Sequence, residues 1–178
     1  AGVERKTVQN YFTILKDLRI AFMLPFFRTK AKRDRLHHEK LYFFDTGVCR
    51  VLRPKALLDR RDEWEGLAME SLCFQELLAL NEYLSWGYAL SYWRTRSGLE
   101  VDFVLHGERG LFAIEVKRSK NLNPKDFHSL LAFKKEHPKA TCILLYGGER
   151  RRLEKGIEIV PFEEGLKSLS TMLDKTFA

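Results

Sequence analysis

The feature that most constrains the fold is a pair of strand-like stretches, residues 100–105 and 112–117, separated by a loop that contains two glycines. In both stretches apolar residues alternate with charged ones, which is the period-2 pattern of a strand with one buried and one polar face. On this pattern Val101 shares the buried face with Leu105. The loop allows an antiparallel hairpin with Leu105 opposite Phe112. The polar faces carry three acids and a lysine: Glu100, Asp102, Glu115 and Lys117.

In that register Asp102 stands directly opposite Glu115, and like charges about 5 Å apart destabilise a sheet. Proteins use such clusters of carboxylate oxygens to hold Mg²⁺ or Mn²⁺. We therefore expect both acids to be metal ligands and Lys117 to orient a water beside them. A register shifted by two residues brings Glu100 opposite Glu115, which makes Glu100 a competing ligand. The other interpretation of this pattern is the solvated face of an ordinary amphipathic hairpin.

A helix is expected over residues 62–84, with its apolar side chains on one broad face. Glu70 projects into this face, close to Cys73 and Phe74. A buried charge is strongly destabilising unless a cation or a network of hydrogen bonds compensates it. Glu70 is therefore either a further metal ligand or one half of a structural ion pair with an arginine such as Arg94.

The expected elements follow one another as helix, three strands, helix and strand, an order that predicts an α/β fold. The helix over 62–84 can cover one face of the sheet and bring Glu70 to the strand carboxylates. A further strand and a helix complete the chain. The strands are expected at residues 88–93, 100–105, 112–117, 141–146 and 156–160, and the two later helices begin near Pro124 and Glu163.

Positive charge is concentrated in residues 1–40, which carry ten Lys and Arg against four Asp and Glu and so hold six of the seven net charges. An amphipathic helix there is followed by strand-like stretches at 20–27 and 40–45, joined by the basic stretch 28–39. This order is the second half of a winged helix-turn-helix, whose wing contacts phosphates. A protein-binding spacer or a solvated cationic loop is the alternative. The expected phosphate contacts of the wing are Lys30, Lys32, Arg33 and Arg35.

Cysteine usage, hydropathy and the first residues predict the compartment of the protein and whether the chain is a fragment. The three cysteines form no CxxC pair, which argues for a reducing cytoplasm and against a thiolate zinc site. The longest apolar run, Ile20–Phe27, is too short to cross a bilayer. The chain starts with Ala-Gly-Val and no initiator Met, so we expect a fragment. Its partial winged helix would span residues 1–47 and a second domain residues 48–178.

Four motifs in combination resemble those of a known family: Lys40-Leu-Tyr-Phe-Phe-Asp-Thr-Gly47, Gly66-Leu-Ala-Met-Glu70, Tyr92-Trp-Arg-Thr-Arg-Ser-Gly-Leu-Glu-Val-Asp-Phe-Val104 and Ala113-Ile-Glu-Val-Lys117. The αβββαβ order with its acids resembles the PD-(D/E)xK, or restriction-endonuclease-like, superfamily. More closely, the motifs resemble the C-terminal domain of unknown function 4143 (DUF4143) of prokaryotic AAA+ family ATPases, which follows a winged helix. This sequence departs from the family in having Ser71 where Asn is commoner, and it contains no GxxxxGK[ST] phosphate loop.

The resemblance implies a nuclease-like site. Glu70, Asp102 and Glu115 would hold Mg²⁺ or Mn²⁺. The Val116 carbonyl would be a further ligand, and Lys117 would serve the nucleophilic water. ATP would bind only in an N-terminal ATPase domain that is absent from this chain. The expected partners are DNA and that ATPase domain, in the cytoplasm and away from any membrane, and the chain is compatible with an oligomer.

The expected reaction is Mg²⁺-dependent hydrolysis of DNA phosphodiesters, in which Lys117 positions the attacking water. The alternative is a non-catalytic module that binds DNA or protein and is regulated by the ATPase domain. Cations on either side of the site are the expected phosphate contacts of the nuclease-like domain, unless they are merely solvated. These flanking cations are Arg94, Arg96, Arg118 and Lys120.

Overall fold

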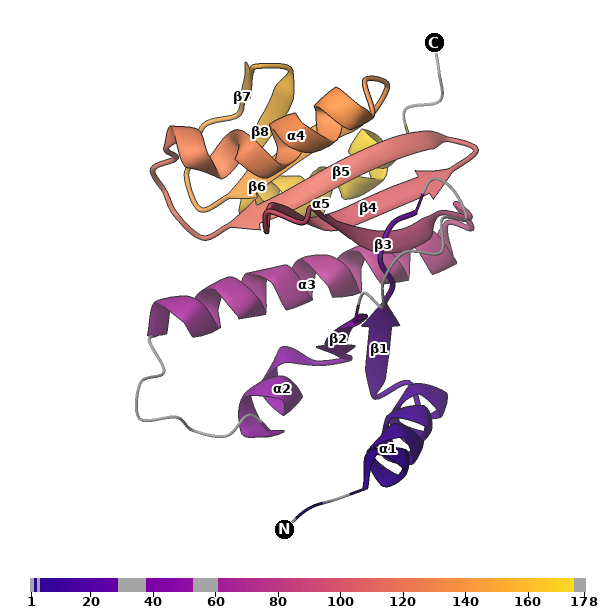
Figure 1. Ribbon diagram of the computed structural model, residues 1–178. Coiled ribbons are helices and arrows are strands. Elements are labelled where there is room, and N and C mark those ends of the chain that lie inside the picture. Colours follow the sequence, from indigo (N-terminus) through magenta and orange to yellow (C-terminus); the bar gives the residue numbers. More distant parts are fainter. Residues whose placement is uncertain (1, 3, 29–37, 53–60, 175–178) are drawn as a thin grey trace.

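The computed structural model describes residues 2, 4–28, 38–52 and 61–174. Within them the chain forms five α-helices, a six-stranded mixed sheet and a two-stranded hairpin, so the predicted mixed α/β class is confirmed (Figure 1). The elements are α1 (Arg5–Asp17), β1 (Ala21–Leu24), β2 (Lys40–Phe43), α2 (Thr46–Leu52), α3 (Arg61–Tyr83), β3 (Ala89–Arg94), β4 (Glu100–Gly107), β5 (Gly110–Lys117), the 3₁₀ turn η1 (Pro124–Phe127), α4 (His128–Glu136), β6 (Thr141–Tyr146), β7 (Arg152–Glu154), β8 (Ile157–Pro161) and α5 (Phe162–Leu173).

The large sheet has the strand order β3-β4-β5-β6-β8-β7. Strand β4 pairs antiparallel with both β3 and β5, whereas β6 runs parallel to β5 and to β8. A parallel step requires a crossover, and η1 together with α4 provides it between β5 and β6. Asn123 caps this crossover, because its side chain accepts a hydrogen bond from the Lys125 N–H. Pro124 occupies the first turn, where no N–H is needed.

Helices cover both faces of the sheet, with α3 and α5 on one side and α4 on the other (Figure 1). On the first side Leu77 of α3 and Leu169 of α5 are fully buried against the strands. On the second side Leu130 and Phe133 of α4 are equally buried. A strand in the middle of such a sheet is enclosed from both sides, which explains why β6 is buried along almost its whole length.

A β-bulge between β3 and β4 changes the predicted faces of β4. The register shifts between Ser91 and Trp93, so β4 has one extra residue at this point. Val101 consequently packs in the cluster on the α4 side, while Phe103 and Leu105 pack in the cluster on the α3 side. The prediction that Val101 shares the buried face with Leu105 is therefore wrong, because the bulge interrupts the strict alternation of a strand.

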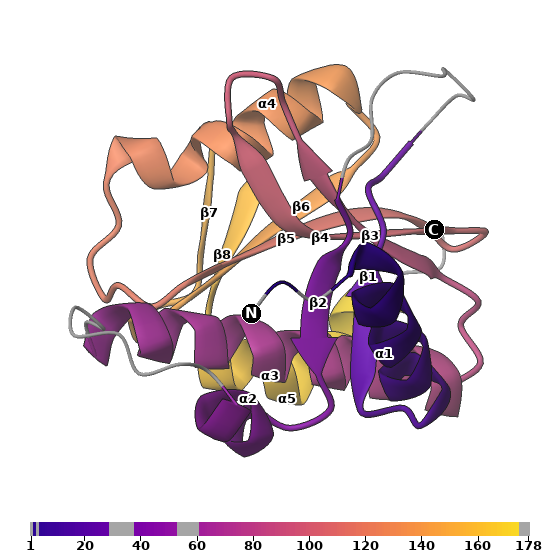
Figure 2. The same cartoon turned by 60° about the horizontal axis from the view of Figure 1, so that its bottom comes forward.

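The N-terminal part consists of α1 and the hairpin of β1 and β2, which lies across α3 and reaches the β3 edge of the sheet (Figure 2). No residue of α1 is buried. By contrast, Leu24 of β1 and Tyr42 of β2 belong to the core on the α3 side. Just after β1, Phe26 forms a parallel bridge with Tyr92, and the Phe27 N–H donates to the Tyr92 carbonyl at 2.6 Å. The hairpin is thus seated on both α3 and β3.

Two short elements were not expected from the sequence. Helix α2 follows β2 and begins beside Asp45, whose carboxylate accepts a hydrogen bond from the Val48 N–H. Strand β7 pairs with β8 at the edge of the sheet. Over the parts of the chain that the structure describes, no helix is both long and apolar enough to cross a membrane.

Candidate functional site

The candidate site lies in a fork between β4 and β5. The observed register pairs Leu105 with Phe112, as predicted, but the β4–β5 ladder ends at Phe103 and Ile114. Beyond this point β4 remains paired with β3, and β5 is paired with β6. The two strands therefore separate just where the acidic residues of both begin.

Asp102 occupies this fork. Its Oδ2 accepts a hydrogen bond from the Val116 N–H at 2.9 Å. The ladder stops short of Asp102 and Glu115, so these acids are not the cross-strand partners that simple extension of the register predicts. The extra residue of the β4 bulge also places Asp102 on the α3 side, within reach of the cation that pairs with Glu70.

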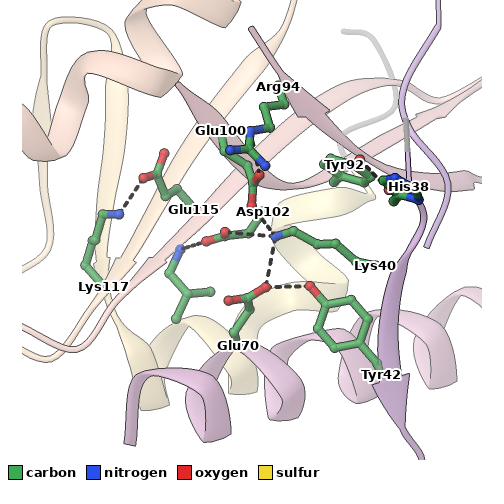
Figure 3. A network of polar contacts seen from close by, with 11 residues as sticks. His38, Lys40, Tyr42, Glu70, Tyr92, Arg94, Glu100, Asp102, Glu115 and Lys117 are labelled. Atoms are coloured by element: carbon green, nitrogen blue, oxygen red, sulfur yellow. Dashed lines mark hydrogen bonds and ion pairs between the residues drawn. The ribbon is translucent and has the colours of Figure 1, made fainter. Parts of the chain in front are cut away.

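Three carboxylates surround the Lys40 ammonium in this fork (Figure 3). The Lys40 Nζ lies 2.7 Å from an oxygen of Glu100, 3.1 Å from one of Glu70 and 3.5 Å from one of Asp102. The acids come from α3 and β4, whereas Lys40 is the first residue of β2. All four side chains are between 15% and 27% exposed, so their charges are largely withdrawn from water. We call these four residues the Lys40 cluster.

Tyr42 fixes the hairpin to the same acids. Its hydroxyl donates to Glu70 Oε1 at 2.5 Å, and its ring stacks on Phe74 with 4.4 Å between centroids. Lys40 and Tyr42 are two residues apart in β2, so both side chains leave the strand on one side. The ring of Tyr92 also lies beside Lys40, with its centroid 5.5 Å from the Nζ. The hairpin thus contributes both a cation and a hydrogen-bond donor to the acids.

Glu70 does form an ion pair, but its partner in the described residues is Lys40 and not an arginine such as Arg94. Arg94 ends β3 opposite Glu100, its partner in the register, and its Nε lies 3.6 Å from a Glu100 oxygen. The Arg94 side chain is 54% exposed, so it forms the solvent-facing rim of the cluster. Glu100, which the sequence offered only as a competing ligand, is therefore a full member of the site.

Glu115 and Lys117 form a separate ion pair on β5, with 2.7 Å between Oε1 and Nζ. Ala113, two residues before Glu115 and hence on the same face, packs in the core on the α4 side. Glu115 is only 3% exposed, and its Oε2 has no hydrogen-bond partner among the described residues. The structure thus turns Glu115 to Lys117, away from Lys40 (Figure 3).

The remaining predicted contacts are divided between the protein surface and segments outside the described ranges. Arg96 and Lys120 are exposed, and Arg118 donates to Glu65 of α3 at 2.7 Å. Their role as phosphate contacts stays a prediction. The wing cations lie outside the described residues, and they are Lys30, Lys32, Arg33 and Arg35.

Burial and neighbouring charges shift several pKa values in the site. Burial, together with the neighbouring Glu70 carboxylate, raises the pKa of Asp102 to about 7, although Lys40 acts in the opposite direction. Burial also raises the pKa of Glu115, against the opposing effect of Lys117. Burial alone lowers the pKa of Lys40, but Asp102 and Glu70 outweigh it and raise that pKa above its ordinary value. The lysines therefore stay charged, while the buried acids favour any bound positive charge.

The side chains of the site are of the kind that binds Mg²⁺ or Mn²⁺, but they are not arranged around a metal ion. Within the described ranges no group of three or more His, Cys, Asp and Glu residues is arranged to hold a metal ion. Carboxylate oxygens are nevertheless the ligands that hard divalent cations prefer. The Lys40 ammonium marks a position where a cation is stabilised, and Glu115 Oε2 is a buried oxygen that hydrogen-bonds to none of the described residues. Val116 enters the fork through its N–H, and its carbonyl as a ligand stays a prediction.

Lys40 and Tyr42 are the site residues that sequence reasoning missed. Their spacing in Lys40-Leu-Tyr-Phe is a period-2 signal that puts both on one side of a strand. That signal could have paired them with each other but not with Glu70, which follows 30 and 28 positions later.

Two family models match the chain. The first, described as a domain of unknown function (DUF4143), matches residues 65–164. The second, described as a domain of unknown function (DUF8612), matches residues 1–60. The carboxylates of the Lys40 cluster thus fall in the first segment, and Lys40 itself falls in the second. No curated protein matches the chain.

Proposed function

The chain belongs to the DUF4143 family, and we propose that it is a metal-dependent nuclease domain of the PD-(D/E)xK, restriction-endonuclease-like class that hydrolyses DNA phosphodiesters. One observation carries the proposal: three carboxylates gather around a single cation at a strand fork, and Glu115 and Lys117 stand on the adjoining strand. The order of α3, three strands, α4 and β6 supports the same class.

In this proposal Glu70, Asp102 and Glu115 hold Mg²⁺ or Mn²⁺, with Glu100 and the Val116 carbonyl as further oxygen donors. The ion, when bound, supplies charge neutralisation at the scissile phosphate and acidifies the attacking water. The Val116 N–H holds Asp102 in the fork through its hydrogen bond to Oδ2, and so fixes the direction of the other Asp102 oxygen.

Lys117 positions the water and the phosphate. Glu115 holds its ammonium at 2.7 Å and favours its charged form. In hydrolysis the water oxygen forms a bond to phosphorus while one P–O ester bond breaks. The water releases a proton to the solvent, and the leaving oxygen takes one up. A fixed ammonium beside the phosphate stabilises the negative charge that develops on its oxygens.

The test is a nuclease assay with millimolar Mn²⁺ or Mg²⁺ on single-stranded, duplex and branched DNA and on RNA. We expect the parent protein to cut at least one DNA form, and we expect Glu70→Gln, Asp102→Asn and Lys117→Ala to abolish cleavage. Glu149→Gln changes an exposed acid outside the fork and serves as the matched control. Cleavage that survives in all three site variants would come from a contaminant and would refute the proposed site.

The second candidate is a non-catalytic module that binds DNA or protein. It is favoured by the observation that Lys40 and Lys117 already form ion pairs with acids of the fork. Divalent metal separates the two functions, because only the nuclease requires it. A protein that cuts nothing and whose melting temperature ignores millimolar Mn²⁺ supports the binding module.

The N-terminal part, residues 1–47, is proposed as a partial winged helix that contacts DNA beside the nuclease-like domain, residues 48–178. The resemblance also implies a AAA+ ATPase module outside this chain, where ATP would bind. Neutralising the wing cations should weaken DNA binding and flatten its dependence on salt, because each lost phosphate contact reduces counterion release. An unchanged salt slope would instead place DNA on the nuclease-like face. The variant combines Lys30→Gln, Lys32→Gln, Arg33→Gln and Arg35→Gln.

A further inference from the structure

The Lys40 cluster joins two parts of the chain that are far apart in sequence. Its cation belongs to the two-stranded hairpin of β1 and β2, and its acids belong to α3 and β4 (Figures 2 and 3). We propose that Lys40 closes the fork: its ammonium takes the position of a divalent cation, and metal enters only when the hairpin withdraws Lys40. This inference rests on the proposed function, because it concerns the regulation of the same site.

The geometry supports competition between Lys40 and a metal ion. The Lys40 Nζ lies 2.7–3.5 Å from oxygens of all three acids. Mg²⁺ and Ca²⁺ bind carboxylate oxygens at about 2.0–2.6 Å, so an ion shared by the same oxygens would overlap the ammonium. Two positive charges so close would also repel each other strongly in a site withdrawn from water. The acids can therefore hold Lys40 or a metal ion, but not both.

The charges of the Lys40 cluster are not balanced, which favours replacement of the Lys40 ammonium by a divalent ion. Three carboxylates face one buried lysine, and the only other cation at an acid of the cluster in the described residues is Arg94, on the exposed rim. A divalent ion neutralises such a group more completely than a single ammonium. Removing the Lys40 charge without adding another should therefore raise the affinity of the fork for a divalent ion.

The hairpin can move away from the fork without breaking the ladders of the six-stranded sheet. In the described ranges the backbone of the hairpin is joined to β3 by one bridge, between Phe26 and Tyr92, and by the two backbone hydrogen bonds around it. Its further attachment is the burial of Leu24 and Tyr42 in the core on the α3 side. The Tyr92 hydroxyl donates to the His38 carbonyl at 2.6 Å, two residues before Lys40. These contacts, with the Tyr42 contact to Glu70, hold Lys40 in place. None of them belongs to a ladder of the six-stranded sheet.

The test measures Mn²⁺ binding by calorimetry in the parent protein, in Lys40→Met and in Lys167→Met. Methionine keeps an unbranched apolar stem and removes the charge, and Lys167 is an exposed lysine of α5 that serves as the matched control. We expect Lys40→Met to bind Mn²⁺ at least about tenfold more tightly than the parent, since a competing close charge has been removed. Lys167→Met should match the parent. Adding Glu70→Gln to Lys40→Met should abolish the gain.

A measurement on the parent protein keeps the test decisive even where Lys40→Met does not fold. Saturating Mn²⁺ should speed amide hydrogen exchange at Tyr42 of β2, which is in a hydrogen-bonded pair with Phe22 of β1, and leave Leu144 of β6 unchanged. Equal Mn²⁺ affinity of the parent and Lys40→Met, or β2 exchange that Mn²⁺ does not speed, would overturn the closing role of Lys40 while leaving a metal site in place. Absence of Mn²⁺ binding in every variant would overturn the proposed function as well.

Discussion

Replacing Tyr42 with Phe isolates one of the hydrogen bonds between the hairpin and α3. The ring of Tyr42 is buried and stacks on Phe74, and phenylalanine preserves that packing. Only the hydroxyl is lost, and with it the 2.5 Å hydrogen bond to Glu70 Oε1. The substitution therefore tests one polar contact with almost no change in buried apolar area.

The expected loss follows from the charge of the acceptor. A hydrogen bond to a charged group contributes about 1.5–3 kcal/mol to the free energy of unfolding. Glu70 keeps part of its compensation, because Lys40 remains 3.1 Å away. We therefore expect a loss of about 1–2 kcal/mol, which for a chain of this size lowers the melting temperature by about 2–8 °C.

The assay is thermal and urea unfolding followed by circular dichroism. Tyr11→Phe is the control, because Tyr11 lies on α1 and is 63% exposed, so its hydroxyl can hydrogen-bond to water in either state. A double-mutant cycle with Glu70→Gln should return a coupling energy of about 1 kcal/mol. If Tyr42→Phe and Tyr11→Phe have the same free energy of unfolding, the hydrogen bond to Glu70 does not stabilise the protein and does not hold the hairpin on α3.

Four further substitutions have expected outcomes that unfolding measurements check. Gly147→Ala should cost about 2 kcal/mol or more, because its Cβ would stand 2.0 Å from the Arg118 carbonyl oxygen, whereas Gly66→Ala, in open space on α3, should stabilise by up to about 1 kcal/mol. Leu77→Ala removes a fully buried side chain and should cost about 2–5 kcal/mol. Folding raises the pKa of Asp102 from 3.8 to about 7, so the folded protein binds this proton more tightly and loses stability as pH rises through that window. Asp102→Asn should therefore gain stability relative to the parent between those pH values, and a constant difference would contradict this.

The elements that carry strong periodicity were predictable from the sequence. Strands β4 and β5 alternate apolar and charged residues, and the short connection between them leaves few registers, so the pairing of Leu105 with Phe112 could be predicted. The apolar face of α3 likewise indicated that Glu70 is turned inward. Short elements, such as α2 with seven residues and β7 with three, have too few positions for a period to show.

The bulge in β4 could not be predicted from the sequence, because no particular residue type marks the position of the extra residue. Its effect is large: it moves Val101 to the α4 side and leaves Asp102 facing α3. The partner of Glu70 was missed for a related reason. A charge count assigns Lys40 to a basic N-terminal region that would meet phosphates, whereas the fold places it among acids. Pairing between distant segments depends on tertiary packing and leaves no local pattern.

The composition of the Lys40 cluster also bears on why it exists. Burying ion pairs removes charges from water, and apolar side chains of similar size often stabilise a protein as well or better. Joining a hairpin to α3 would therefore require only contacts such as the stacking of Tyr42 on Phe74. Three acids around one lysine go beyond that need, and burial together with the Glu70 carboxylate raises the pKa of Asp102. An arrangement that is costly for stability but rich in oxygen donors is expected where a site must bind a cation, and the hairpin that supplies Lys40 then decides whether that cation is a side chain or a metal ion.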